Sequence, residues 1–303
     1  MTVPIIVNPH STGYSERLAE WFGKFENHGA SVIDITADGA YEGLNGAQRI
    51  ITYCGDGTLT RLLTELGKRG NGFPELVPLA GGSGNAISRE VGYTPKDVLE
   101  IEVKRALGEH LEGEELPLLE VDVTAKGEKE QHFATFGSIG IEGKICHRYE
   151  RWRGIIGGYP GYAASILTTL LNPFSNTALH VYIAENGRTE AYQGGVLAFG
   201  TTRFYGHGII AHPNAQKLRQ EGKMSVRFFD TRWGKTPLLA LAWPALSKGK
   251  YEGELAHDFE TKELSFTYDR GLYAQIGGEP IEGVTKLRVK MGPKVRFVTK
   301  DHP

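Results

Sequence analysis

The stretch ITYCGDGTLTRLL, residues 51–63, runs from an apolar segment through a tight glycine turn into a helical pattern. The apolar residues before Gly55 predict a buried β-strand, and the pattern that begins at Thr58 and Leu59 predicts a helix. A strand that leads through a short turn into a helix is the repeating unit of a parallel sheet with crossover helices. The stretch therefore predicts an α/β fold.

The same alternation extends over the first part of the chain. Apolar runs at residues 4–8, 31–36 and 76–82 are separated by helical patterns. This alternation predicts that residues 1–120 form one α/β domain around a parallel sheet.

One helix of this domain has a recognisable start. Thr94 is a residue type favoured at the N-cap, and Pro95 follows it at the first helical position. The pair predicts a helix that extends to about Leu107.

The pattern changes in the second part of the chain, residues 121–288. Strand-like runs separated by glycine replace the alternation and predict an all-β domain, an antiparallel β-sandwich. Helical patterns interrupt the strands at residues 161–172 and 236–250. The chain is thus expected to combine an α/β domain with a β-sandwich.

Bulk composition limits the partners. The 303 residues carry a net charge of −2, which lacks the basic footprint of a nucleic-acid binder. The two cysteines, Cys54 and Cys146, are too few for a disulfide framework and fit a reducing compartment. No apolar stretch approaches the roughly 20 residues of a spanning helix. We expect a cytoplasmic protein without nucleic-acid partners, with peripheral contact at a membrane left open.

Three glycine-rich turns follow three of the predicted parallel strands. They are VNPHSTG at residues 7–13, GDGT at residues 55–58 and AGGSGNA at residues 80–86. Turns that follow parallel strands lie together at the carboxyl edge of the sheet, where open α/β folds bind ligands. Backbone N–H groups at a helix start favour phosphate oxygens there. The turns therefore predict a nucleotide phosphate site.

Asp56 is the carboxylate at the tip of the second turn. A carboxylate repels phosphate, so its expected task is to act through Mg²⁺ or to accept a proton from an attacking hydroxyl. For this turn alone, the alternative is an ordinary βα turn with Thr58 as N-cap and Asp56 merely polar and exposed.

The order of the three turns resembles the diacylglycerol kinase catalytic domain family, which includes bacterial diacylglycerol kinases, sphingosine kinases and ceramide kinase. The matching motifs are Asn-Pro-x-Ser from Asn8, Gly-Asp-Gly-Thr from Gly55 and Gly-Ser-Gly-Asn from Gly82. The likeness continues over nearly the whole chain, at residues 138–167, 203–226, 274–283 and 287–300.

The resemblance implies an NAD kinase-like nucleotide-binding domain followed by a β-sandwich, with residues 289–303 returning to the first domain. It further implies ATP and Mg²⁺ as cofactors and phosphorylation of a lipid hydroxyl, on diacylglycerol or a sphingoid-type lipid. A lipid substrate and transient membrane contact are the implied partners, and a homodimer is left open. NAD kinase shares the Gly-Asp-Gly-Thr turn, but the early Asn-Pro-x-Ser motif and the late Gly-Glu-Pro strand favour the lipid branch.

Site residues follow from the same motifs. The resemblance implies Asp56 and Glu279 as catalytic residues, and Asp56, Glu279 and Glu221 as metal-associated residues. The implied nucleotide-binding residues are Asn8, Ser11, Thr12, Gly55, Gly57, Thr58, Gly82, Ser83, Gly84 and Asn85.

Five positions depart from the family pattern. Cys54 replaces a glycine, Arg61 a glutamate, Thr201 an asparagine, and Glu221 an aspartate. At Gly277 the sequence lacks the aspartate that is favoured as general base in the bacterial lipid kinases.

Two interpretations remain. In the first, Asp56 is the base and Glu279 helps to hold Mg²⁺; phosphoryl transfer depends mostly on positioning and charge stabilisation, so it tolerates a weak base. In the second, the chain is a pseudokinase that binds a nucleotide or a lipid.

Two histidines and two further segments were considered for functional roles, and each has a simpler structural explanation. His207 and His212 lack neighbours at metal-ligand spacing and are expected at the surface. Residues 148–154 are candidates for contact with anionic headgroups, and residues 238–246 for a lipid-facing patch. A solvated helix face and a core helix are the commoner explanations of such segments.

Overall fold

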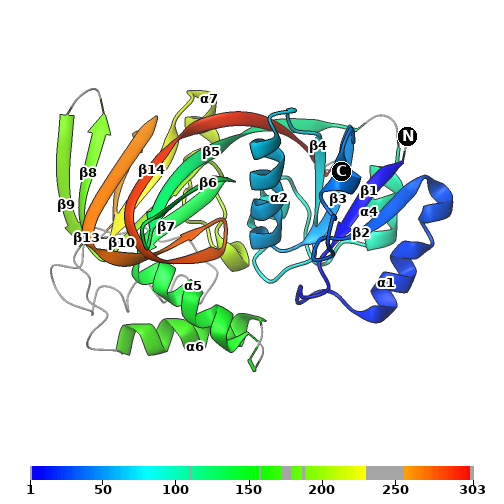
Figure 1. Ribbon diagram of the computed structural model, residues 1–303, viewed down its shortest axis with the longest axis horizontal. Helices are drawn as coiled ribbons and strands as arrows, with labels where there is room; N and C mark the ends of the chain where they lie inside the picture. The colour runs from blue at the N-terminus through cyan, green and yellow to red at the C-terminus, as the bar shows by residue number, and fades with distance from the viewer. Residues whose placement is uncertain are drawn as a thin grey trace. The chain divides into compact units, whose positions relative to one another are not determined.

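The computed structural model describes residues 2–108, 111–153, 155–156, 158–171, 179–185, 188–229 and 256–300. The chain divides into two compact units, Met1–Leu116 with Lys294–Pro303, and Pro117–Pro293. Both divisions fall inside long strands, β5 (Gly113–Ala125) and β14 (Glu279–Val298), so the expected boundary at residue 120 lies within β5 (Figure 1). The segments predicted at residues 236–250 and 238–246 lie outside the described residues.

The first unit is the predicted α/β domain. Its sheet has the order β2-β1-β3-β4, and every pair is parallel. The strands are β1 (Val3–Val7), β2 (Ala30–Asp34), β3 (Arg49–Cys54) and β4 (Glu75–Ala80). The helices are α1 (Glu16–Gly23), α2 (Asp56–Arg69), α3 (Ala86–Glu90) and α4 (Leu99–Ala106), with 3₁₀ turns at Glu26–His28 and Glu42–Leu44. The central strands are fully buried at residues such as Ile5 and Ile51, which explains their apolar sequence.

Helix α4 starts later than predicted. Its N-cap is Val98, and Thr94 instead closes a turn with Asp97: the Thr94 N–H donates to Asp97 Oδ2 at 2.7 Å and the Thr94 hydroxyl to Oδ1 at 3.1 Å. Such side-chain bonds offer the backbone an alternative to the helix. Thr94 and Pro95 therefore precede the helix instead of opening it.

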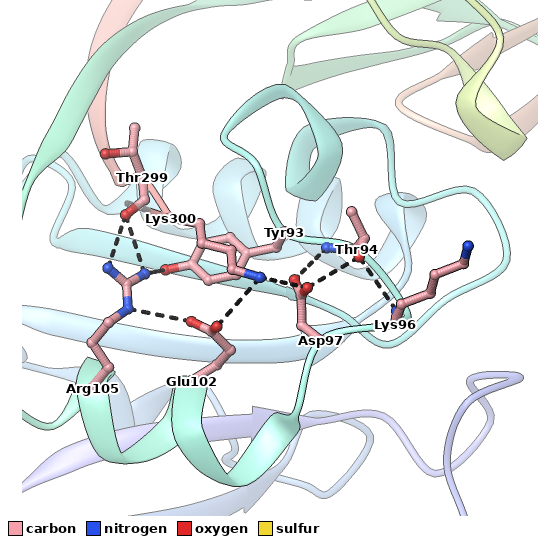
Figure 2. A network of polar contacts seen from close by, with 8 residues as sticks. All are labelled: Tyr93, Thr94, Lys96, Asp97, Glu102, Arg105, Thr299 and Lys300. Carbon is pink, nitrogen blue, oxygen red and sulfur yellow. Dashed lines mark hydrogen bonds and ion pairs between the residues drawn. The ribbon is translucent and has the colours of Figure 1, made fainter. Parts of the chain in front are cut away.

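The C-terminal residues pair with the first unit. Phe297 of β14 lies in parallel register with Leu76 of β4. Beyond the strand, Lys300 Nζ lies 2.5 Å from Asp97 Oδ1, and Arg105 donates to the Thr299 carbonyl at 3.1 and 3.2 Å (Figure 2). Burial alone would raise the pKa of Asp97, but the Lys300 ammonium and the Thr94 donors outweigh it and lower that pKa.

In its described residues, the second unit contains the remaining strands and three helices. The strand order is β12-β11-β10-β7-β13-β14, with β5 beside β14 and β6 beside β5, and β8 and β9 form a separate hairpin. The strands are β6 (Glu128–Ala134), β7 (Phe136–Gly140), β8 (Leu179–Glu185), β9 (Arg188–Gly194), β10 (Val196–Gly200), β11 (Met224–Phe229), β12 (Ala256–Thr261) and β13 (Glu263–Ile276). The helices are α5 (Ile141–Trp152), α6 (Gly158–Leu171) and α7 (Ala215–Gln220), with a 3₁₀ turn at Gly206–Gly208.

The sheet of the second unit folds over one core. Strands β5 and β11 are separated by four other strands in the hydrogen-bonding order. Their inward residues, such as Val121 and Val123 of β5 and Val226 and Phe228 of β11, nevertheless belong to the same buried cluster. Side chains from distant strands can meet in this way only if the sheet closes face to face. The predicted sandwich packing is thus confirmed.

In the described part of the chain, no helix combines the length and the apolar character needed to cross a bilayer.

Candidate functional site

The three glycine turns meet at the carboxyl edge of the first unit's sheet. The Gly13 N–H donates to the Gly81 carbonyl at 3.2 Å, which joins the first turn to the third. A Cβ placed on Gly82 would lie only 2.3 Å from the Cα of Gly55, and one on Gly81 only 2.7 Å from the Cys54 nitrogen. Glycine is required at these turns because the backbones pack directly against each other.

Asn8 links the first turn to helix α2. Its Nδ2 donates to the Thr58 hydroxyl at 2.7 Å, and its Oδ1 accepts from the His10 N–H at 2.8 Å. Thr58 is the third residue of α2, and the N-cap is Gly55. The alternative in which Thr58 is the N-cap is therefore wrong; its hydroxyl instead accepts a bond that fixes the first turn.

The remaining residues of the first turn are more accessible. The Ser11 N–H donates to the Asn8 carbonyl at 2.9 Å, so Ser11 is held by the turn, and its side chain is half-buried. Thr12 is exposed.

Asn85 shapes the third turn. It adopts a left-handed conformation, with φ 54° and ψ 41°, and is buried. Its Oδ1 accepts from the Gly82 N–H at 2.8 Å, and its Nδ2 donates to the Gly82 carbonyl at 2.5 Å. Asparagine tolerates the left-handed region better than most residues. Asn85 thus closes a loop around the half-buried Ser83 and Gly84.

Asp56 is buried and bonded, and the alternative of a merely exposed carboxylate is wrong. It is 9% exposed, and its Oδ1 accepts from the Ala86 N–H at 2.7 Å and the Ile87 N–H at 3.4 Å. The first residue of α2 therefore caps the start of α3. Burial raises the pKa of Asp56 to about 6, although these N–H donors and the Arg89 guanidinium act to lower it.

Helix α2 supplies the donors expected for phosphate. Its first helical bond runs from the Leu59 N–H to the Gly55 carbonyl at 3.1 Å, so the N–H groups of residues 56–58 have no partner within the helix. The helix continues for 14 residues, which aligns its dipole with these donors. Gly57 and Thr58 are half-buried here. This arrangement suits the oxygens of a phosphate group.

The same site fits Mg²⁺ bound together with phosphates. The two bonds from α3 use only Oδ1 of Asp56. No group of three or more His, Cys, Asp or Glu side chains gathers for a metal anywhere among the described residues. Mg²⁺ commonly takes one or two carboxylates and completes its shell with phosphate oxygens and water. One carboxylate beside N–H groups that can bind phosphate is compatible with this coordination of Mg²⁺.

The Arg61 side chain acts on other groups than Asp56. Arg61 is exposed on α2, and its charge acts to lower the pKa of the Tyr41 hydroxyl, which burial and Glu65 raise. The guanidinium that acts on Asp56 is that of Arg89 on α3. Arg61, which stands where the resemblance led us to expect glutamate, therefore does not place a positive charge beside Asp56.

In the second unit, Gly277 and Gly278 form the turn between β13 and β14. Ile276 pairs with Glu279, and the two glycines have φ values of 56° and 90°. A two-residue hairpin loop with positive φ at both positions favours glycine, asparagine or aspartate. The Gly277 N–H donates to the Phe136 carbonyl at 2.8 Å. Glu279, the first residue of β14, is half-buried.

A buried polar network lies beneath this turn. The Gly278 N–H donates to Gln275 Oε1 at 2.7 Å, and Gln275 Nε2 donates to the Tyr205 hydroxyl. The Tyr205 hydroxyl donates to Glu142 Oε2 at 2.8 Å. Burial raises the pKa of Glu142 to about 7, against the opposing effect of the Ser138 and Tyr205 donors.

The sequence did not single out Glu142, Tyr205 or Gln275. Glu142 lies in α5, Tyr205 in the loop before the 3₁₀ turn Gly206–Gly208, and Gln275 in β13, so the three residues are far apart in the sequence. Of the three, only Glu142 could have been found from the sequence, because it is a carboxylate at a junction between a strand and a helix.

Two other implied positions have different surroundings. Glu221, the proposed metal ligand, is exposed at the end of α7, 4.0 Å from Lys217 Nζ and 3.8 Å from Lys223 Nζ. Its metal role stays a prediction, since its recorded partners are cations. Thr201 is buried, and its hydroxyl donates to the Thr135 carbonyl at 3.2 Å.

His212 corrects the expectation of a surface histidine. It is fully buried, and its Nδ1 lies 3.2 Å from the Ser225 hydroxyl. The His212 N–H donates to the Arg203 carbonyl, which folds the loop back so that the ring packs on Gly200. Burial lowers the pKa of His212 to about 3. The exposure of the His207 side chain lies outside what the structure describes.

The solved structures that share this architecture include diacylglycerol kinases. One, a diacylglycerol kinase from Bacillus anthracis str. Sterne, has a TM-score of 0.63 at 18% identity, over 99% of this chain and 97% of that chain. A second from the same organism, whose kinase name is provisional, gives a TM-score of 0.65 at 18% identity with the same coverage. No protein-family profile and no curated protein sequence matches the chain. The chain therefore has the fold of these diacylglycerol kinase structures.

Proposed function

We propose that the protein is an ATP-dependent lipid kinase, which transfers a phosphoryl group to a hydroxyl of diacylglycerol or a sphingoid-type lipid. One observation carries the proposal: the buried Asp56 carboxylate lies at the start of α2, beside N–H groups that have no helical partner. The shared fold supports diacylglycerol as the first acceptor to test, because the similar structures carry that name.

Positioning is the main task of the first unit in this proposal. The N–H groups of residues 56–58 receive phosphate oxygens, and the bond between Asn8 and Thr58 holds the adjoining turn in place. Mg²⁺, when bound, supplies positive charge that stabilises the transferred phosphoryl group. Ser11 and Thr12 in the first turn and Ser83 in the third are the proposed nucleotide-binding residues with hydroxyl side chains.

Asp56 is the base in this proposal and accepts the proton of the attacking hydroxyl. Burial raises the pKa of Asp56, which makes its carboxylate a better proton acceptor than that of an ordinary aspartate. Glu279, at the start of β14, is the proposed second carboxylate for Mg²⁺.

Transfer of labelled phosphate tests the function. The protein is incubated with labelled ATP, Mg²⁺ and detergent-dispersed diacylglycerol, sphingosine or ceramide, and the lipid products are separated. We expect label in at least one lipid, with diacylglycerol first. Absence of label from every lipid, in protein that is folded and binds ATP, would argue against the kinase.

Binding without transfer is the second candidate function. The turn at Gly277 and Gly278 favours it, because the carboxylate expected there from the resemblance is absent. This candidate predicts a rise in melting temperature with ATP and Mg²⁺ but no labelled lipid.

A further inference from the structure

Helix α3 of the first unit carries the two N–H groups that bind the Asp56 carboxylate. It has only five residues, and the side chain of its own N-cap residue, Asn85, does not cap it. Asp56 Oδ1 takes that place by accepting from the Ala86 and Ile87 N–H groups. A helix of this length is not stable by itself, so its position depends on what holds its two ends and its buried face.

The far end of α3 is closed by a tight turn. Gly92 has φ 94°, and its N–H donates to the Arg89 carbonyl at 3.2 Å. The Tyr93 N–H donates to the Ser88 carbonyl at 2.8 Å. This is the Schellman pattern, in which a left-handed glycine ends a helix. The carbonyl of the C-cap residue, Val91, remains for a bond from another segment.

That bond comes from the C-terminal residues that follow β14. The Lys300 N–H donates to the Val91 carbonyl at 2.9 Å, and the Thr299 N–H donates to the Glu112 carbonyl at 3.0 Å. Residues 299 and 300 belong to the first unit, as α3 does. They therefore hold the end of α3 although they come from a distant part of the chain.

The Lys300 side chain anchors these residues. Its Nζ lies 2.5 Å from Asp97 Oδ1 and 3.6 Å from Glu102 Oε1 (Figure 2). Glu102 is buried, and only 14% of the Asp97 side chain is exposed. Ion pairs that are partly sheltered from water are screened less than exposed ones. Lys300 is therefore expected to fix the C-terminal residues in place.

Arg105 of α4 joins the same residues to the turn after α3. Its guanidinium donates to the Thr299 carbonyl at 3.1 and 3.2 Å and also to the Tyr93 hydroxyl (Figure 2). Tyr93 is 1% exposed and directly follows the glycine that ends α3. We call Thr299, Lys300 and Arg105 the C-terminal clasp.

We propose that Lys300 and Arg105 are positioning residues for Asp56 that act through α3. The clasp fixes one end of α3, and the other end presents two N–H groups to the carboxylate. One helical turn packed in a dense interior has little room to absorb a displacement, so a shift at Val91 reaches Ala86. Loss of the clasp therefore weakens the bonds that orient the Asp56 carboxylate.

Packing alone is the competing explanation for the position of α3. Ala86 and Ile87 are fully buried, so α3 also rests on the core of the first unit. The clasp nevertheless supplies what packing cannot. The Val91 carbonyl and the Tyr93 hydroxyl belong to buried residues, and buried polar groups are costly without a partner.

This inference rests on the proposed function only for what Asp56 does in the reaction. The hold of the clasp on α3 is measured in protein without nucleotide. A failure of the clasp and a failure of the kinase are therefore distinguishable.

Hydrogen–deuterium exchange of the full chain tests the hold on α3. Lys300→Met keeps the apolar stem but removes the charge. In this variant the Ala86 and Ile87 N–H groups should exchange about tenfold faster or more, because bonds to charged groups are lost. Arg105→Met should have the same effect. Exchange in β3, residues 49–54, should stay as in the parent, which would show that the change is local.

Lys294→Met is the matched control. Lys294 lies in the same C-terminal part of the first unit, 3.8 Å from Glu115 Oε2, and 63% of its side chain is exposed. This variant removes the same charge outside the clasp, so α3 should exchange as in the parent. Lys300→Arg restores a cation beside Asp97 and should return the exchange of α3 most of the way to the parent rate.

ATP binding reports on the Asp56 site. Calorimetry with ATP and Mg²⁺ should give a Kd about tenfold higher in Lys300→Met than in the parent, a typical coupling between two sites. Lys294→Met should bind as the parent does, and Lys300→Arg should recover most of the affinity. Because coupling is reciprocal, bound ATP should slow exchange of the Lys300 N–H in the parent.

Three results would contradict the proposal. Unchanged exchange at Ala86 and Ile87 in both methionine variants of the clasp would show that packing alone holds α3. Equal acceleration in β3 would mean that the clasp only stabilises the unit as a whole. Faster exchange in α3 with an unchanged Kd for ATP would separate the clasp from Asp56. A parent protein that does not bind ATP would count against the proposed function, and the exchange rates would still decide whether the clasp holds α3.

Discussion

The Asp56 carboxylate joins two helix starts. It is the first residue of α2, and its Oδ1 accepts N–H bonds from the first residues of α3. The proposed catalytic role uses the same carboxylate. A substitution that keeps the acceptor oxygen but removes the charge can separate these two roles.

Replacing Asp56 by asparagine should leave stability within about 1 kcal/mol of the parent, because an amide oxygen can still accept from the Ala86 N–H. Replacement by alanine removes the cap and leaves buried N–H groups unpaired, so we expect a loss of about 2 kcal/mol. Urea denaturation of the three proteins measures both values. Equal losses in the two variants would show that the charge, and not the acceptor, stabilises α3.

His212 should make stability depend on pH. Burial lowers the pKa of His212 from its ordinary value of 6.5 to about 3 in the folded protein. The unfolded chain therefore binds more protons than the folded protein between pH 3 and pH 6.5. Stability contributed by the neutral ring is present above pH 6.5 and is lost as the pH falls. The raised pKa values of Asp56 and Glu142 act in the opposite direction, so a variant comparison is needed.

Between pH 6.5 and 5, the free energy of unfolding should fall by about 2 kcal/mol more in the parent than in a His212→Asn variant. Urea denaturation at the two pH values gives the difference. The exposed His10→Asn variant serves as the control and should follow the parent. Parallel pH profiles in the parent and the His212→Asn variant would contradict a buried, neutral ring.

The turns after β3 and β4 depend on backbone contact. Gly82 and Gly55 approach so closely that a Cβ on Gly82 would lie 2.3 Å from the Gly55 Cα. Gly82→Ala should therefore cost about 3 kcal/mol, the upper range for overpacking. Gly23→Ala is the control: no heavy atom lies within 4 Å of the new Cβ, and alanine suits the helix, so stability should rise slightly. A stable Gly82→Ala protein in thermal denaturation would show that the turns are not packed in this way.

The β13–β14 turn can accept the carboxylate that the sequence lacks. Gly277 is buried and has φ 56°; aspartate is among the residues accepted at the first position of such a turn, so Gly277→Asp should fold with a loss of about 1–3 kcal/mol. If a missing base limits the reaction, the rate of lipid phosphorylation should rise by about 10²-fold or more. Gly278→Asp, at φ 90°, carries the same charge one residue later and should be less stable and show no gain. No gain in folded Gly277→Asp protein would indicate that the reaction is not limited by a base there.

The sequence predicted the parallel strands and the convergence of the three turns because both depend on local patterns. Apolar runs that end in glycine suffice for that inference, as residues 51–63 illustrate. The partners of Asp56 could not be predicted, because Ala86 lies 30 residues away and meets it only after the sheet has formed. The start of α4 was misplaced because the competing bond between Thr94 and Asp97 has the same residue types as a helix cap.

The two units have separate cores, and the chain connects them through β5 and β14. Asp56 belongs to the first unit, and Glu279 belongs to the second. The sequence indicated an α/β part and an all-β part, since the period of the apolar pattern changes near residue 120. It could not show that distant strands of the second unit close over one core, because that closure depends on side chains far apart in the chain.

Phosphoryl transfer to diacylglycerol, compared between the parent protein and Asp56→Asn, tests the central claim most directly. Labelled ATP, Mg²⁺ and dispersed diacylglycerol are supplied in excess, and labelled phosphatidic acid is counted over time. We predict transfer by the parent and a rate at least about 10²-fold lower in the folded Asp56→Asn protein, the loss expected when a general base is removed. Transfer at the same rate in both proteins would contradict the assignment of Asp56 as the base.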